Sequence, residues 1–241
     1  MGEATVNTAR STIEEASARI DPTWRGVYRV GGACMLLAGL VYIISAVLSI
    51  VIGPPPSGGE PYLQGLATHA LVSQVNFGLW VLADLALLPA VMALYLALKQ
   101  IAKNAMLIAA GLMLLFAVLD LAVTELNSLT LVTLTQQYAA AASDAQRSAY
   151  VAAADYALAT LPIATFLSYM VSSVGLFIIS LVMLKGVFSK PAAYAGLVAS
   201  IAGIIGGFYF IVPALAALLV PSLIAFGLWS LLAGARLWTL G

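Results

Sequence analysis

The chain has 241 residues, of which 63% are hydrophobic and only 8% are charged, with zero net charge and a mean hydropathy of +1.05. About a quarter of the residues of a soluble domain are charged, so this composition excludes a soluble globular protein and indicates an integral membrane protein. A nucleic-acid surface is excluded because no basic cluster lies away from the membrane ends. Cys34 and His69 are single residues of their types, so neither an intrachain disulfide nor a multi-histidine metal centre can form.

Residues 1–28 form a predicted cytoplasmic N-terminal segment. Five apolar residues spaced by three or four predict a short amphipathic helix, with a frayed tail as the alternative: Val6, Ala9, Ile13, Ala16 and Ile20. Asp21 and Pro22 then have the pattern of a helix N-cap and first helical residue. The segment is too long and too acidic for a signal peptide, so the first hydrophobic stretch is expected to stay as an anchor.

Six hydrophobic segments follow, and they predict an all-α bundle of six membrane spans in a single domain, 29–241. The first three spans are expected at about Val30 to Ile52, Leu71 to Leu98 and Ala105 to Gln136, and the next two end near Leu184 and Phe210. The sixth ends near Trp238, and the sequence leaves its start undefined between Pro213 and Pro221. Ser143 and Gln146 have capping-box spacing, which predicts an extracytoplasmic helical segment from Asp144 before the fourth span.

The distribution of basic residues predicts the orientation. Nine of the ten Lys and Arg residues lie in the N-terminal segment, in the second and fourth inter-span loops, or at the C-terminus, and only Arg147 falls on the other side. Basic residues accumulate on the cytoplasmic side of a membrane, so both termini are expected in the cytoplasm.

The third span carries polar residues inside an otherwise apolar run. Asp120, Thr124 and Asn127 recur at i, i+4 and i+7, which is one stripe of an α-helix, and Glu125 lies beside them. A carboxylate at mid-bilayer costs about 2.5 to 3.5 kcal/mol on insertion scales, so this stripe is expected to face other protein.

The second and fourth spans carry matching polar stripes. His69, Ser73 and Asn76 share a face of the second span, and Asp84 lies on its continuation at the same expected depth as Asp120. The fourth span adds Thr165, Ser168 or Tyr169, and Ser172 at helical spacing. The three stripes predict a polar cavity between the second, third and fourth spans that opens toward the extracytoplasmic side.

The charges inside the spans are unbalanced, because the acids there have no Lys or Arg at the same level. Four ways to balance this charge remain open: the acids are protonated and hydrogen-bonded, they share protons, they bind a cation, or Arg147 and His69 fold over the opening of the cavity. Burial and a neighbouring like charge both favour the protonated form of a carboxylate. We therefore expect at least one of Asp84 and Asp120 to be neutral at pH 7.

The main functional hypothesis is that the cavity binds or passes a small cationic or protonatable solute. The candidate binding residues are Asp84, Asp120, Glu125, Asn127, Asn76 and His69. Two alternatives stay open: the polar groups are interhelical hydrogen-bond glue, or the protein is an accessory or structural subunit of a homo-oligomer or larger membrane complex. In that last case the glycine-rich fifth and sixth spans, with Gly203 and Gly207 as a GxxxG pair, would be the docking surface. Membrane lipids are the other expected partners.

No enzyme is predicted. The sequence has no nucleophile elbow, no phosphate-binding loop and no lysine within a span for a Schiff base, and it identifies no cofactor and no metal site.

Five sequence features, taken in their order along the chain, carry a resemblance to a known family. They are a Trp-Arg lead, Tyr28-Arg29-Val30-Gly31-Gly32 opening the first span, a Gly-Pro-rich outer turn, Leu-Lys closing the second span, and Asp120 with Glu125-Leu126-Asn127-Ser128 in the third. In this order the chain resembles a family of uncharacterised prokaryotic six-span membrane proteins recorded as a domain of unknown function. The resemblance covers about Trp24 to Trp238. It implies a multi-pass protein of the prokaryotic inner membrane and brings no catalytic residues.

Overall fold

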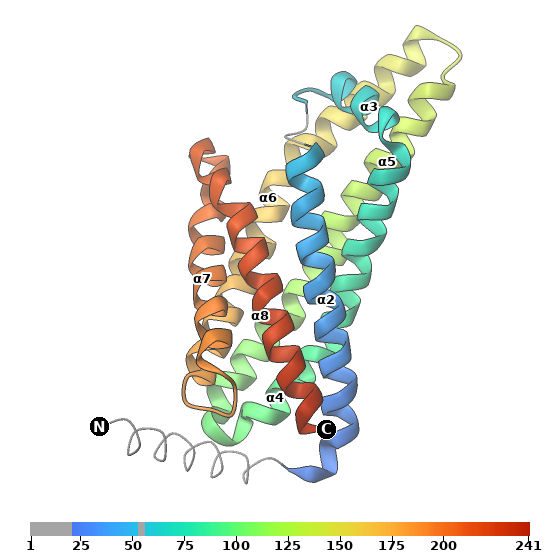
Figure 1. The fold of residues 1–241 in the computed structure, drawn as a ribbon. Coiled ribbons are helices and arrows are strands. Elements are labelled where there is room, and N and C mark those ends of the chain that lie inside the picture. Colours follow the sequence, from blue (N-terminus) through green and yellow to red (C-terminus); the bar gives the residue numbers. More distant parts are fainter. Residues whose placement is uncertain (1–20, 53–55) are drawn as a thin grey trace.

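The protein is a bundle of long helices (Figure 1). The structure, a computed structural model, describes residues 21–52 and 56–241, and no strand occurs in these two ranges. The predicted all-helical class is confirmed there. The predicted amphipathic helix before Asp21 lies outside the described residues.

The helices follow one another with short connections. In chain order the elements are η1 Pro22–Trp24, α2 Arg25–Ile52, α3 Gly59–Thr68, α4 Ala70–Leu119, η2 Asp120–Glu125, α5 Leu126–Ala140, α6 Asp144–Met183, α7 Lys190–Gly207, η3 Phe208–Phe210, η4 Pro213–Leu218 and α8 Leu219–Leu240. Among the described residues, five continuous helical stretches are long and apolar enough to cross a membrane, the longest being Ala70–Ala140. The sixth hydrophobic segment begins with the 3-10 helix η4, which explains why periodicity did not define its start.

The longest stretch folds back on itself. Ala102 inside α4 has φ −153° and ψ 73°, far from helical values, between Lys99 and Lys103. A straight helix would place Asp84 and Asp120 about 54 Å apart at a rise of about 1.5 Å per residue, whereas their carboxylate oxygens lie within 4.8 Å of each other. The ribbon in Figure 1 accordingly reverses direction in α4, so the second and third hydrophobic segments form antiparallel arms.

Two predicted helix starts are confirmed. Asp21 caps η1 by accepting a hydrogen bond from the Thr23 amide, at 3.0 Å. The Thr23 hydroxyl and amide both donate to this carboxylate, and they hold the pKa of Asp21 below its ordinary value. Ser143 caps α6 at Asp144 by accepting from the Gln146 amide, and α6 then continues through Pro162 without a break.

The helices pack in a closed ring in the order α2, α4, α6, α7 and α8, with α8 returning to α2. Glycine allows a close approach between α2 and α8. A Cβ placed on Gly234 would lie 2.9 Å from the Leu36 nitrogen, and one on Gly32 would lie 2.9 Å from the Gly234 oxygen. Small residues at such crossings let two backbones meet.

The glycines of α7 are also used inside the chain. A Cβ on Gly203 would collide with the Ser173 hydroxyl of α6, and one on Gly207 would lie 3.0 Å from the Met170 side chain. The face that carries the GxxxG pair is therefore occupied by α6. These glycines supply no observation in favour of docking to another chain.

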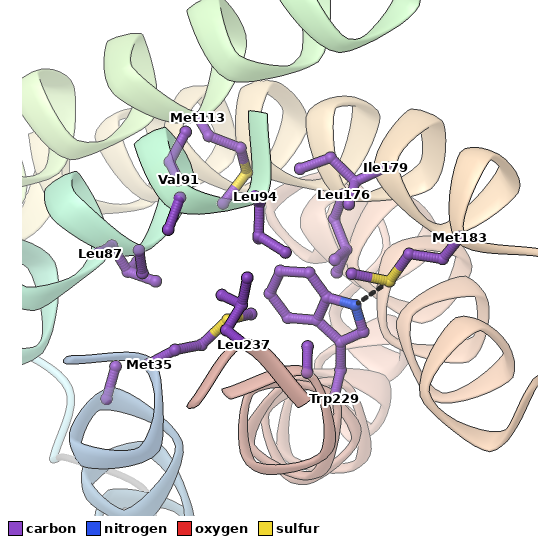
Figure 2. Close-up of a cluster of buried hydrophobic side chains, with 14 of the residues drawn as sticks. Met35, Leu87, Val91, Leu94, Met113, Leu176, Ile179, Met183, Trp229 and Leu237 are labelled. Carbon is purple, nitrogen blue, oxygen red and sulfur yellow. Dashed lines mark hydrogen bonds between the residues drawn. The ribbon is translucent and has the colours of Figure 1, made fainter. Parts of the chain in front are cut away.

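The main apolar core fills the half of the bundle nearer the bend at Ala102. Trp229 of α8 lies fully buried at its centre, and its indole Nε1 donates to the Met183 sulfur at 3.4 Å. Figure 2 shows Leu94, Leu176 and Ile179 around this indole. The other side chains labelled in Figure 2 are aliphatic or methionine, so this half is mainly apolar, and the buried hydroxyl of Ser180 also lies close to the indole.

The opposite end of the bundle extends well past the other helices. α6 has 40 residues and α7 only 18, which corresponds to about 60 Å against about 27 Å. α3 packs on this extension, where the Tyr138 hydroxyl donates to Glu60 at 2.7 Å and the Gly59 amide donates to Asp155 at 2.6 Å. A small second apolar cluster that includes Leu63 and Leu131 lies beneath α3.

Candidate binding site in the bundle interior

Three acidic side chains converge inside the bundle. Asp84 lies on the first arm of α4, and Asp120 and Glu125 lie on η2, which continues the second arm. One carboxylate oxygen from each lies within 4.8 Å of the other two. The exposed fractions of Asp84, Asp120 and Glu125 are 0%, 9% and 5%, so the cluster is an interior feature and not a solvated surface.

A π-helical turn brings the third acid into this cluster. In an α-helix, residues five apart differ by about 140° in direction, so Asp120 and Glu125 would face different sides. η2 is a π-helix over Asp120–Glu125, in which hydrogen bonds join residues five apart and stack residue i+5 over residue i. Single π-turns inside α-helices are rare and occur frequently at functional sites. The α-helical stripe predicted from the sequence missed this alignment.

Tyr42 of α2 holds the innermost acid. Its fully buried hydroxyl donates to Oδ1 of Asp84 at 3.2 Å. Oδ2 of Asp84 and Oε2 of Glu125 are buried and face no donor. Asp84 and Asp120 are close enough for a proton on one to bridge to the other. A protonated carboxyl supplies its own donor, so a shared proton would satisfy an otherwise orphaned oxygen.

Two hydroxyl groups lie beside Asp120 without completing its hydrogen bonds. Thr124 and Ser168 are near enough to interact with its carboxylate, yet neither side-chain oxygen makes a hydrogen bond of acceptable geometry. Ser168 lies on α6 and is only 2% exposed. Burying a polar group without a hydrogen-bond partner costs about 1 to 3 kcal/mol of folding free energy. The hydrogen-bonding potential of these two hydroxyls is therefore not fully satisfied within the protein.

The acids have no basic counter-ion at their level among the described residues. Seven of the eight described Lys and Arg residues lie at the end of the bundle that carries the Ala102 bend, and Arg147 lies at the other end, beside Asp144. At the first end Lys99 lies over the Trp24 ring, 5.8 Å from its centroid, and Arg236 donates to the Val187 carbonyl. Charge balance at the acids therefore requires protons or a bound cation.

A cavity of about 70 Å³ adjoins the acids and is partly open to the outside of the protein. Its lining comes from α2, α4, η2, α6, α7 and α8: Tyr42, Trp80, Phe116, Asp120, Tyr169, Ser172, Ser173, Leu176, Ala199, Ser222, Leu223 and Phe226. Asp120 is the acid that reaches the cavity, and Asp84 lies behind Tyr42. The cavity thus occupies the middle of the ring of helices, whereas the sequence predicted walls from the second, third and fourth spans alone.

The other predicted site residues do not join this cluster. The Asn127 amide donates to the Ala157 carbonyl at 3.0 Å and to the Thr160 hydroxyl at 3.2 Å, so it ties α5 to α6. His69 is exposed at the junction of α3 and α4. Asn76 is half-buried, with a buried Oδ1 that has no partner. None of the three lines the cavity beside Asp120.

Sequence reasoning missed the aromatic wall. Tyr42 lies edge-on to Trp80, with ring centroids 5.5 Å apart, and edge-on to Phe226 at 4.8 Å. Aromatic residues in the middle of a hydrophobic span look like ordinary packing residues. The one available signal was depth, because Tyr42 and Phe226 lie away from the span ends where belt residues are expected.

Comparisons of the chain with protein-family models, with curated proteins and with solved structures give no match. The family resemblance of the sequence therefore stays a prediction. Fold and site define the class of the protein, a bundle of helices that includes several long and apolar enough to cross a membrane, with a buried acidic cluster beside an aromatic cavity.

Proposed function

We propose that this is a six-span membrane protein whose interior cavity binds, and passes, a small cationic or protonatable solute. The observation that carries the proposal is the convergence of Asp84, Asp120 and Glu125 within 4.8 Å, buried and without a basic partner at their level among the described residues. Ionisable groups at membrane depth are costly and are typical of ion and substrate pathways.

The proposed topology follows from the bend at Ala102 and from the positions of the basic residues. With the bend at Ala102, the stretch Ala70–Ala140 supplies two crossings, and the four other helical stretches supply one each. The end that carries seven of the eight described basic residues is proposed to face the cytoplasm, together with both chain termini. The extension formed by α3 and the α5–α6 turn is then extracytoplasmic. The resemblance supports a prokaryotic inner membrane as the location.

Exchange between protons and the solute is the expected chemistry. Three carboxylates this close cannot all be ionised without compensation, because like charges in a low-dielectric interior repel strongly. A cation that enters beside Asp120 replaces a proton as the compensating charge. Binding should therefore release protons, and the apparent affinity should rise as pH rises.

The experiment measures thermal unfolding of the purified protein in detergent, with Na⁺, K⁺, Mg²⁺, Ca²⁺ and methylammonium as separate probes. A solute at about 100 times its dissociation constant stabilises a folded state by about 2.7 kcal/mol, which is easily detected. Asp84→Asn and Asp120→Asn should lower the stabilisation, whereas Asp144→Asn, a change in a fully exposed acid at the extracytoplasmic end, should not.

The proposal fails if both interior variants fold normally and no cation in the panel stabilises the wild-type protein. In that case the acids are hydrogen-bond glue between the arms of α4.

A further inference from the structure

The cavity beside Asp120 has a more aromatic and apolar lining than the binding of an inorganic cation requires. Five aromatic rings from four helices line it: Tyr42, Trp80, Phe116, Tyr169 and Phe226. Apolar carbon forms most of the wall, and Asp120 is the one acid in it. The aromatic rings are an observation independent of the acidic cluster, to which Asp120 belongs.

Inorganic cations fit such walls poorly. Ca²⁺ takes six to eight oxygen ligands, and Mg²⁺ keeps a strict octahedral shell of oxygens, often from water. An organic ammonium ion differs because its alkyl groups are apolar and its charge is spread over them. Such ions are recognised by aromatic cages, in which the ring faces attract the cation at about 0.5 to 2 kcal/mol per contact.

Three of the five hydroxyls that line the cavity are already oriented by the protein. Ser222 donates to the Ala199 carbonyl at 2.8 Å and Ser172 donates to the Ser168 carbonyl at 2.9 Å. The Tyr42 hydroxyl donates to Asp84. With their protons directed at these acceptors, the three oxygens have only lone pairs left for a ligand. Lone pairs and a carboxylate suit an N–H donor or a positive charge, not an anion.

We propose that the cavity selects a small alkylated ammonium ion, with Asp120 as its counter-ion and the rings of Tyr42, Trp80, Phe116, Tyr169 and Phe226 around its alkyl groups. This inference rests on the proposed function and names its solute class. The cavity of about 70 Å³ is smaller than the roughly 150 Å³ that accommodates benzene, so the ligand has only a few heavy atoms.

The test uses calorimetric titration of the purified full chain with methylammonium, tetramethylammonium, Na⁺, Ca²⁺ and tert-butanol. The last probe is a neutral molecule with the same number of heavy atoms as tetramethylammonium. Wild-type protein should bind at least one alkylammonium ion more than about tenfold more tightly than Na⁺ or tert-butanol, because both the charge and the alkyl surface contribute.

Cage variants separate this inference from the proposed function. Phe116→Leu and Phe226→Leu should weaken alkylammonium binding by about 2- to 30-fold, which corresponds to the loss of one cation–π contact. They should leave any Na⁺ binding unchanged. Phe166→Leu is the matched control, because Phe166 contacts Phe208 and Phe210 and does not line the cavity.

Each contrary result has a distinct meaning. If inorganic cations bind and alkylammonium ions do not, the inference is overturned and the proposed function stands. Equal binding of tert-butanol and tetramethylammonium also overturns it, because the cavity would then be merely apolar. If no cation of either kind binds, the proposed function itself fails.

Discussion

The two halves of the bundle interior are built on opposite principles. Near the cytoplasmic end, as proposed, Trp229 and its neighbours pack densely, and glycines bring α2 and α8 into backbone contact. Farther along the same helices, the interior contains three acids close together, a π-helical turn and a cavity. The first half is mainly apolar, whereas the second contains buried acidic groups that are costly at membrane depth.

The contrast also suggests how the site is closed on one side. Phe226 of the cavity wall stacks on Trp229 of the core, with ring centroids 5.3 Å apart, one helical turn farther along α8. The apolar core thus forms the floor of the cavity on the side of the Ala102 bend. A solute that passes to that side would require this floor to move.

The largest expected effect is in the packed half. Trp229→Ala removes a fully buried indole, so the free energy of unfolding should fall by about 3 to 5 kcal/mol. Thermal unfolding in detergent measures it. Trp238→Ala is the matched control, because that indole is 51% exposed and should cost far less. Equal losses for both variants would show that the core near Trp229 is not tightly packed.

The next effect tests the contact between α2 and α8. Gly234→Ala places a methyl group against the backbone of α2 and should destabilise the protein by about 1 to 3 kcal/mol. Gly111→Ala is the control, since nothing lies within 4 Å of its Cβ position. That change should stabilise α4 by up to about 1 kcal/mol through helix propensity. Opposite signs are expected, and the same sign would contradict the close approach.

In the site half, substitution should have the reverse effect on stability. Asp84→Asn removes a buried ionisable group with an orphaned oxygen, so stability should stay constant or rise by about 1 kcal/mol. Cation binding should nevertheless weaken, because the negative charge of Asp84 lies close to Asp120, and the loss should be smaller than that of Asp120→Asn because Asp84 does not line the cavity. Unfolding and calorimetric titration on the same preparation measure the two effects. A large loss of stability with unchanged binding would mean that the acid is structural.

The smallest effect concerns Asn127. Its amide joins α5 to α6, and interhelical hydrogen bonds in membrane proteins contribute about 0.6 kcal/mol on average. Asn127→Ala should therefore lower stability by about that amount and leave cation affinity unchanged. A change in affinity as large as that of the acid variants would place Asn127 back in the site.

The sequence predicted the parts of this site that depend on depth and missed those that depend on local backbone geometry. Counting residues from the span ends placed Asp84 and Asp120 at one level, and the structure brings them together. The direction of Glu125 depends on a π-turn, for which the sequence carries no known signature. Tyr42 was missed because an aromatic residue within an apolar span has no pattern that separates a ligand wall from a core.

The most direct test is an infrared difference spectrum of the purified protein at neutral pH, before and after addition of the alkylammonium ion that binds most tightly in the calorimetric titration. If the acids share protons and Asp120 receives the ammonium ion, a band of protonated carboxyl groups should decrease on binding, and the change should be absent in Asp120→Asn. Saturating ligand that leaves the carboxyl region unchanged in the wild-type protein would contradict the account.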